Sequence, residues 1–172
     1  MIILSYELFA QLLTYPCAEY GELVRKLAGR SQDDHLSIFA EEMSTLSRED
    51  FEELYTRTFD INPVSSLEVG WHLYGETYER GSFLVKMRQS LKALGIQEST
   101  ELPDHLSHVL CVLEKLEPVE ANELAVKYVA PALGKMLEGF KEKRNPYEHV
   151  LLALQRVIQE RHSHGVERHE QQ

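Results

Sequence analysis

The chain has 172 residues, of which 43% are hydrophobic and 27% are charged. This length and balance fit one compact folded domain and exclude wholesale disorder. With 18 Lys and Arg against 28 Asp and Glu, the net charge is −10, which disfavours a nucleic-acid backbone or an anionic membrane as the main partner.

No stretch of the sequence approaches the roughly 20 apolar residues that cross a bilayer, so we expect no membrane insertion. The first residues, Met-Ile-Ile-Leu-Ser-Tyr-Glu, carry no basic region and no small-residue cleavage site, which predicts a cytoplasmic protein. Cys17 and Cys111 lie far apart in the sequence and form no CxxC pair, which favours reduced thiols.

Apolar residues recur at three- and four-residue spacing along the chain, which is the period of amphipathic helices. Leu4, Leu8 and Leu12 share one helical face, and Pro16 ends this first segment because its ring cannot continue the hydrogen-bond ladder. A capping box at Ser47-Arg-Glu-Asp50 opens a later helix. The helices predicted after the first one cover residues 19–28, 34–43 and 51–59.

The second half of the chain gives the same signal with clear interruptions. A capping box at Ser65-Ser-Leu-Glu68 predicts a helix through Trp71, and Gly75 is expected to bend it or to let another element approach. Pro131 is expected to kink a long helix, and Asn145-Pro-Tyr-Glu148 supplies the start of the last one. The other helices predicted here cover residues 83–94, 103–116, 124–140 and 147–158.

These elements predict the fold class all-α, as a single-domain helical bundle over residues 1–160. Residues 161–172 are polar and are predicted to form a tail that contains His162, His164 and His169. Neutral imidazoles at such spacing bind a transition metal weakly, so metal handling by the tail is one alternative function. The plain interpretation is a solvated terminus.

Enzyme signatures are missing from the sequence. It contains no glycine-rich phosphate loop, no GxSxG elbow, no HExxH and no cysteine–histidine zinc spacing. We therefore expect no catalytic activity and no cofactor. A small helical enzyme that uses His72, Glu76 or His105 as acid–base groups stays open as a second alternative.

The stretch from Ser66 to Gly75 is unusually rich in aromatic and polar-tipped side chains. Trp71, His72 and Tyr74 lie near Glu68 and Glu76, and such a set suits a groove with apolar walls and a carboxylate rim. A groove of this kind would bind an amphipathic basic segment of a partner. Ordinary helix packing with a solvated acidic face is the alternative interpretation.

The stretch Glu101-Leu-Pro-Asp-His105 is a second candidate site. Asp104 is well placed to cap the helix that follows, and His105 then lies near the positive end of the helix dipole. The simpler interpretation is a structural cap with a histidine on the surface.

Several motifs follow one another in order: Leu54-Tyr-Thr-Arg-Thr-Phe-Asp60, Ser66-Leu67 through His72, Gly75-Glu76, Arg80-Gly81 and Glu101-Leu-Pro-Asp-His-Leu106. Together they resemble the NarJ-type chaperones of respiratory nitrate reductase, within the wider TorD/DmsD group of redox-enzyme maturation proteins. The similarity runs from about Leu4 to Ile158 and includes Ala130-Pro131.

The resemblance implies an all-helical cytoplasmic chaperone without catalytic activity. Such proteins bind the N-terminal, twin-arginine-like segment of a molybdoenzyme catalytic subunit, here nitrate reductase alpha or a relative, and assist molybdenum cofactor insertion and assembly. They exist as monomers or domain-swapped dimers. This chain lacks the long C-terminal extension of many nitrate reductase chaperones, so perchlorate, selenate or dimethyl sulfide-type enzymes stay open as clients.

The resemblance also assigns site residues by position. Tyr55 and Phe59 match the aromatic motif that lines the peptide groove, and Thr58 stands where the wider group has leucine. Asp104 and His105 match the Asp-His pair of the hinge motif. The residues that match the central motif of the nitrate reductase branch are His72, Gly75, Glu76, Arg80 and Gly81.

The resulting hypothesis is that arginines of the bound segment pair with Glu68, Glu76 and Asp104. Its apolar side chains then pack on aromatic residues of the groove. The predicted peptide-binding residues are Tyr55, Phe59, Glu68, Trp71, His72, Tyr74, Glu76, Arg80, Asp104 and His105.

Overall fold

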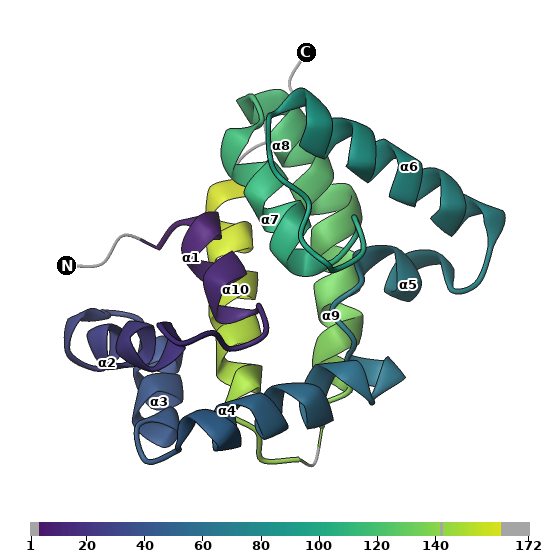
Figure 1. Cartoon of the computed structure of the whole chain (residues 1–172). Helices are drawn as coiled ribbons and strands as arrows, with labels where there is room; N and C mark the ends of the chain where they lie inside the picture. The colour runs from purple at the N-terminus through teal and green to yellow at the C-terminus, as the bar shows by residue number, and fades with distance from the viewer. Residues whose placement is uncertain (1–3, 142, 163–172) are drawn as a thin grey trace.

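The computed structural model describes residues 4–141 and 143–162. Every regular element within these ranges is helical, which confirms the predicted all-α class. The last helix, α10 (Tyr147–His162), runs through the middle of the bundle, between α1 (Tyr6–Leu12) and α9 (Ala130–Glu138) (Figure 1). This arrangement buries the apolar face of α10, including Val150, Leu151 and Leu154.

The N-terminal helices begin and end close to the predicted positions. They are α2 (Tyr20–Arg30), α3 (Asp34–Met43) and α4 (Arg48–Tyr55). The capping box at the start of α4 is confirmed, because the Asp50 amide donates to Ser47 Oγ at 3.2 Å and the Ser47 amide donates to Asp50 Oδ2 at 3.0 Å. Asp33 caps α3 and pairs with Arg156, so it ties α3 to α10.

Two helices contain a wider π-turn. In the first, α4 continues as η1 (Thr56–Asp60); in the second, η3 (Ala125–Val129) joins α8 (Pro118–Leu124) to α9. Pro131 is the second residue of α9, after Ala130, and it has no amide hydrogen and crowds the carbonyl group four residues earlier, which lies in η3. The π-turn relieves that crowding, so the irregularity expected at Pro131 takes this form.

The middle of the chain forms η2 (Pro63–Ser65), α5 (Val69–Tyr74), α6 (Tyr78–Ala93) and α7 (Leu106–Lys115). The capping box predicted at Ser65 to Glu68 is wrong: Ser65 ends η2, and Glu68 precedes α5 without a side-chain capping bond. Gly75 has φ +63° and turns the chain from α5 into α6, which confirms the expected bend. A side chain there would be strained, since this conformation favours glycine.

The predicted boundary between bundle and tail, after residue 160, falls inside α10. Arg161 and His162 close α10, and His162 is buried, with Nε2 at 2.7 Å from the Tyr6 hydroxyl and Nδ1 at 3.1 Å from Asn122 Oδ1. His164 and His169 lie outside the described residues. None of the helices in the described ranges is long and apolar enough to span a membrane.

Candidate functional site

The two candidate stretches lie side by side, although they are far apart in the sequence. Glu68 and His105 form an isolated antiparallel bridge. The Val69 amide donates to the Asp104 carbonyl at 2.9 Å, and the Leu106 amide donates to the Leu67 carbonyl at 2.8 Å. We call this pairing the clasp, because it fixes the start of α5 against the start of α7.

Asp104 lies at the centre of the clasp and is fully buried. Its Oδ2 accepts from the Gly70 amide at 3.0 Å and from Arg80 Nε at 3.4 Å, so it caps α5 across space. The expectation that it caps the following helix is wrong, since His105 is the N-cap of α7 and its Nδ1 accepts from the Ser107 amide. Within the described part of the chain, Asp104 Oδ1 has no hydrogen-bond partner.

His105 is buried as well, so the interpretation as a surface histidine is wrong. Because Nδ1 accepts from the Ser107 amide, the neutral ring carries its proton on Nε2, which lies 3.3 Å from the Tyr55 hydroxyl. The Tyr55 hydroxyl in turn donates to the Leu13 carbonyl. Burial, with the nearby His108, lowers the pKa of His105 to about 4. The imidazole is therefore neutral at pH 7.

Tyr55 and Phe59 are core residues and do not line an open groove in this structure. Their rings lie 6.0 Å and 4.8 Å from the buried Tyr147 ring. Tyr15 covers Tyr55 edge-on at 5.6 Å and is 45% exposed. A bound segment would therefore meet Tyr15 before it could meet Tyr55.

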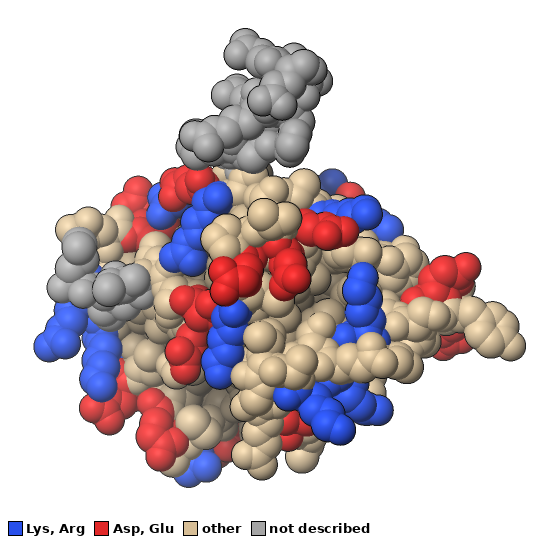
Figure 2. Space-filling model, turned by 90° about the horizontal axis from the view of Figure 1, so that it is seen from above, with Lys and Arg blue, Asp and Glu red and all other residues tan. Residues whose placement is uncertain are grey.

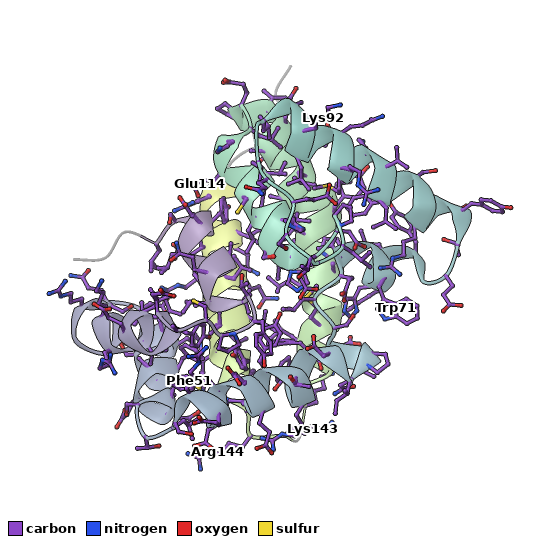
Figure 3. The ribbon with its side chains drawn as sticks, viewed as in Figure 1. Phe51, Trp71, Lys92, Glu114, Lys143 and Arg144 are labelled. Carbon is purple, nitrogen blue, oxygen red and sulfur yellow. The ribbon has the colours of Figure 1, made fainter. Side chains whose placement is uncertain are left out.

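Trp71 is a half-buried residue of α5, and its side chain extends toward the turn that carries Pro63 (Figure 3). Its indole Nε1 donates to the Pro63 carbonyl at 3.1 Å. The Arg80 guanidinium lies 5.9 Å from the Trp71 ring centroid and also pairs with Asp104. Arg80 thus connects α6 to Trp71 on α5 and to Asp104 in the clasp.

The remaining predicted residues spread outward from the clasp. His72 Nε2 donates to the Ser66 carbonyl at 2.6 Å, and burial lowers the pKa of this imidazole against the opposing effect of that bond. Tyr74 packs toward α6, with its ring 6.0 Å from Phe83. Glu76 is exposed on the turn after α5, where it shares a shallow hollow with Arg80.

Two carboxylates that the sequence-based prediction did not include, Asp60 and Glu101, lie within electrostatic range of the predicted Glu68 at the clasp. Burial raises the pKa of Asp60, and burial together with the charges of Asp60 and Glu68 raises the pKa of Glu101. We call Asp60, Glu68 and Glu101 the acidic rim. Across residues 4–141 and 143–162, no Lys or Arg forms an ion pair with any of the three.

All three residues of the acidic rim belong to the sequence motifs described above. Their spacing in the sequence does not predict that they lie near one another. Asp60 ends the first motif, Glu68 lies in the second and Glu101 begins the last, and the bridge between Glu68 and His105 brings the last motif to the second. Exposed apolar side chains follow two of them in the chain, Ile61 at 71% exposure and Leu102 at 46%. Glu101 Oε2 lies 4.0 Å from His105 Nε2, but that imidazole is neutral at pH 7 and does not offset the charge. The surface therefore combines carboxylates without a Lys or Arg partner among the described residues with apolar area, which suits a basic, partly apolar ligand.

The described residues contain no group of three or more His, Cys, Asp or Glu side chains arranged to hold a metal ion. Of the three tail histidines, only His162 is described, and both of its ring nitrogens have partners.

Comparison with known proteins identifies the family. Residues 35–161 match the family model described as nitrate reductase delta subunit. The nitrate reductase molybdenum cofactor assembly chaperone NarJ of Escherichia coli K12 is 30% identical over 148 residues, which cover 80% of this chain and 62% of that protein. A probable chaperone of the same name from Bacillus subtilis is 27% identical over 160 residues, which cover 87% of this chain and 87% of that protein.

The present chain thus spans somewhat less than two thirds of the length of its Escherichia coli relative and most of the Bacillus one. The family match includes α4, the clasp and α10, so it covers all of the predicted site residues. On this evidence the chain is a NarJ-type member of the nitrate reductase delta subunit family.

Proposed function

We propose that this chain is a cytoplasmic chaperone, without catalytic activity, that assists molybdenum cofactor insertion into a nitrate reductase. It does so by binding the N-terminal, arginine-containing segment of the catalytic subunit. The observation that carries the proposal is the similarity, over 80% and 87% of this chain, to two proteins named as molybdenum cofactor assembly chaperones.

The geometry supports a peptide ligand with positive charge. The acidic rim holds three carboxylates that no Lys or Arg of the described ranges neutralises, and the chain as a whole carries a net charge of −10. Guanidinium groups form charge-assisted, bidentate hydrogen bonds with carboxylates. Since burial raises the pKa of Asp60 and Glu101, a bound arginine would also relieve an unfavourable site.

The apolar part of the segment would pack beside the rim. Ile61, Leu102 and Tyr15 offer exposed apolar surface there, and Trp71 is half-buried nearby. A few such contacts supply most of the affinity of a peptide complex, whereas the charges set orientation and encounter rate. Asp104 and His105, which the sequence assigned to the ligand, act in this proposal by holding the clasp together.

The acid–base alternative has no observation in its favour. His72 and His105 bond to different partners, Ser66 on one side and Tyr55 with Ser107 on the other. Glu76 stands apart on an exposed turn. We therefore advance only the chaperone.

The test is calorimetry with a synthetic peptide of the N-terminal segment of the nitrate reductase catalytic subunit from the same organism. The variant Asp60→Asn, Glu68→Gln, Glu101→Gln should bind the peptide at least about tenfold more weakly, since three charge-assisted contacts are lost. The matched control Glu41→Gln, Glu117→Gln, Glu120→Gln changes the net charge equally at exposed sites and should bind normally.

Equal loss in both variants would show that only the overall charge matters and would count against the acidic rim. Absence of any binding to the wild-type chain would contradict the proposed function itself. Purification of the chain from its native cell provides a second readout, because the catalytic subunit is expected to accompany it.

A further inference from the structure

A hollow of about 500 Å³ lies between the end of α1 and α2. Its lining includes Gln11 of α1, Leu23 of α2 and, from the connecting loop, Thr14, Tyr15, Cys17 and Glu19. All of these residues precede residue 35, where the match to the family model begins. The volume lies within the range of roughly 300–1,000 Å³ that is typical of ligand pockets.

Tyr15 connects this hollow to the proposed peptide site. Its ring lines the hollow and also packs edge-on against Tyr55 at 5.6 Å. Burial raises the pKa of Tyr55, and so do the charges of all three members of the acidic rim, which places its phenol within their field. The Tyr55 hydroxyl lies 3.3 Å from His105 Nε2, which in turn lies 4.0 Å from Glu101 Oε2 of the rim. The Tyr15–Tyr55 pair therefore connects the hollow to the rim, along a path that a few extended residues at about 3.3 Å each can follow.

The chemistry of the hollow suits an apolar side chain with a cation beside it. Tyr15 and Leu23 contribute apolar surface, and Glu19 and Glu22 contribute negative charge. The Cys17 thiol donates to Glu19 and lowers its pKa, so this carboxylate stays ionised at pH 7. Lys26 contributes the one positive charge of the lining, and it lies 3.6 Å from Glu22. This balance disfavours phosphates and other anions.

We infer that the hollow between α1 and α2 receives an apolar side chain of the same segment whose arginines lie at the acidic rim. The inference rests on the proposed function and extends it with a second subsite. Charge complementarity selects the occupant, because both the rim and the hollow are negative and the proposed ligand is basic. Tyr15 forms the wall that the two subsites share.

Cys17 provides a direct probe, because its thiol is exposed and lines the hollow. In a Cys111→Ser chain, saturating peptide should slow alkylation of Cys17 at least about tenfold, since the bound side chain covers the thiol. The matched control carries Cys17→Ser, Cys111→Ser and Val119→Cys. Position 119 is exposed on α8, and its alkylation should proceed at the same rate with and without peptide.

A filled hollow provides the second test. Thr14→Trp places a large ring in the hollow from an exposed position and should weaken the peptide about tenfold, whereas Val119→Trp should not. A peptide with its apolar residues replaced by serine should bind wild type and Thr14→Trp equally. If the peptide binds the wild-type chain but does not protect Cys17, and also binds Thr14→Trp normally, the inferred subsite is wrong while the proposed function stands. A wild-type chain that binds no peptide overturns the proposed function with it.

Discussion

His105 shows how one buried side chain makes the stability of this protein depend on pH. The structure holds the ring neutral, with Nδ1 accepting from the Ser107 amide and Nε2 near the Tyr55 hydroxyl. Its folded-state pKa of about 4 lies below the ordinary value of 6.5, so a proton binds the unfolded chain more tightly. The contribution of His105 is therefore complete above pH 6.5 and is lost as the pH falls toward 4.

We expect the free energy of unfolding to fall by about 2 kcal/mol between pH 7 and pH 5 through this group. His105→Gln, which keeps an acceptor but does not titrate, should remove that part of the slope. Urea denaturation of both chains at the two pH values measures the difference. Identical slopes would mean that His105 is not held neutral in the folded state.

At the residue scale, the structure shows how the side chains named by the motifs are held, and their role in ligand binding stays a prediction. The motifs located Asp104, His105 and Arg80, and the structure joins Arg80 to Asp104 and His105 to the bridge with Glu68. The structural roles differ from the predicted ones, because Asp104 caps a helix that begins 35 positions earlier in the chain. Contacts at that separation leave no trace in local spacing.

At the scale of elements, the packing of α5 against the clasp depends on one glycine. A Cβ atom at Gly70 would lie 2.6 Å from Asp104 Oδ2 and 2.9 Å from Phe83 Cδ1. Asp104 is fully buried and Phe83 nearly so, which leaves little room to move. The short α5 therefore reaches its position only because residue 70 has no side chain.

Gly70→Ala should lower the free energy of unfolding by about 1–3 kcal/mol through overpacking. The matched control is Gly81→Ala on α6, where, apart from the adjacent residues and the nearby backbone of the same helix, no atom lies within 4 Å of the added carbon. That change should be neutral or stabilise by about 0.5–1 kcal/mol. Chemical denaturation of both variants tests the contrast, and an unaffected Gly70→Ala protein would show that α5 shifts at no cost.

Element boundaries were predicted well where the signal was local. The capping box at Ser47 and the cap at Asn145 both act on neighbouring residues: Asn145 Oδ1 accepts from the Tyr147 amide at 3.0 Å, as an N-cap should. The first helix, in contrast, ends at Leu12, four residues before the predicted stop at Pro16. The start of α5 was predicted wrongly because its first amides are satisfied from the other side of the clasp, by the Asp104 carbonyl and carboxylate. Tertiary contact replaced the local cap there.

At the scale of the whole molecule, the charge of −10 acts on encounter rather than on the bound contacts. On the face seen in Figure 2, Lys and Arg side chains are interspersed with Asp and Glu side chains, so this face presents no field of a single sign. The acidic rim, in contrast, joins three carboxylates without an Arg or Lys partner among the described residues.

The association rate of the basic peptide should therefore fall about tenfold when salt is raised from ~0.02 M to ~0.5 M, while the dissociation rate changes little. Stopped-flow fluorescence of Trp71, which is half-buried near the site, provides the signal. A peptide with its arginines replaced by glutamine serves as the control and should show a much flatter dependence. Equal salt dependence for both peptides would contradict electrostatic steering.

The clasp also has a topological consequence. The backbone bonds that join Leu67 to Leu106 and Val69 to Asp104 close the intervening chain, with α5 and α6, into a ring without a covalent link. Any motion that moves α5 and α6 away from the start of α7 must break both backbone bonds. It must also break the hydrogen bonds from the Gly70 amide and Arg80 Nε to the Asp104 carboxylate. Because all of these bonds join the same two segments, we expect the segments to separate as one cooperative unit.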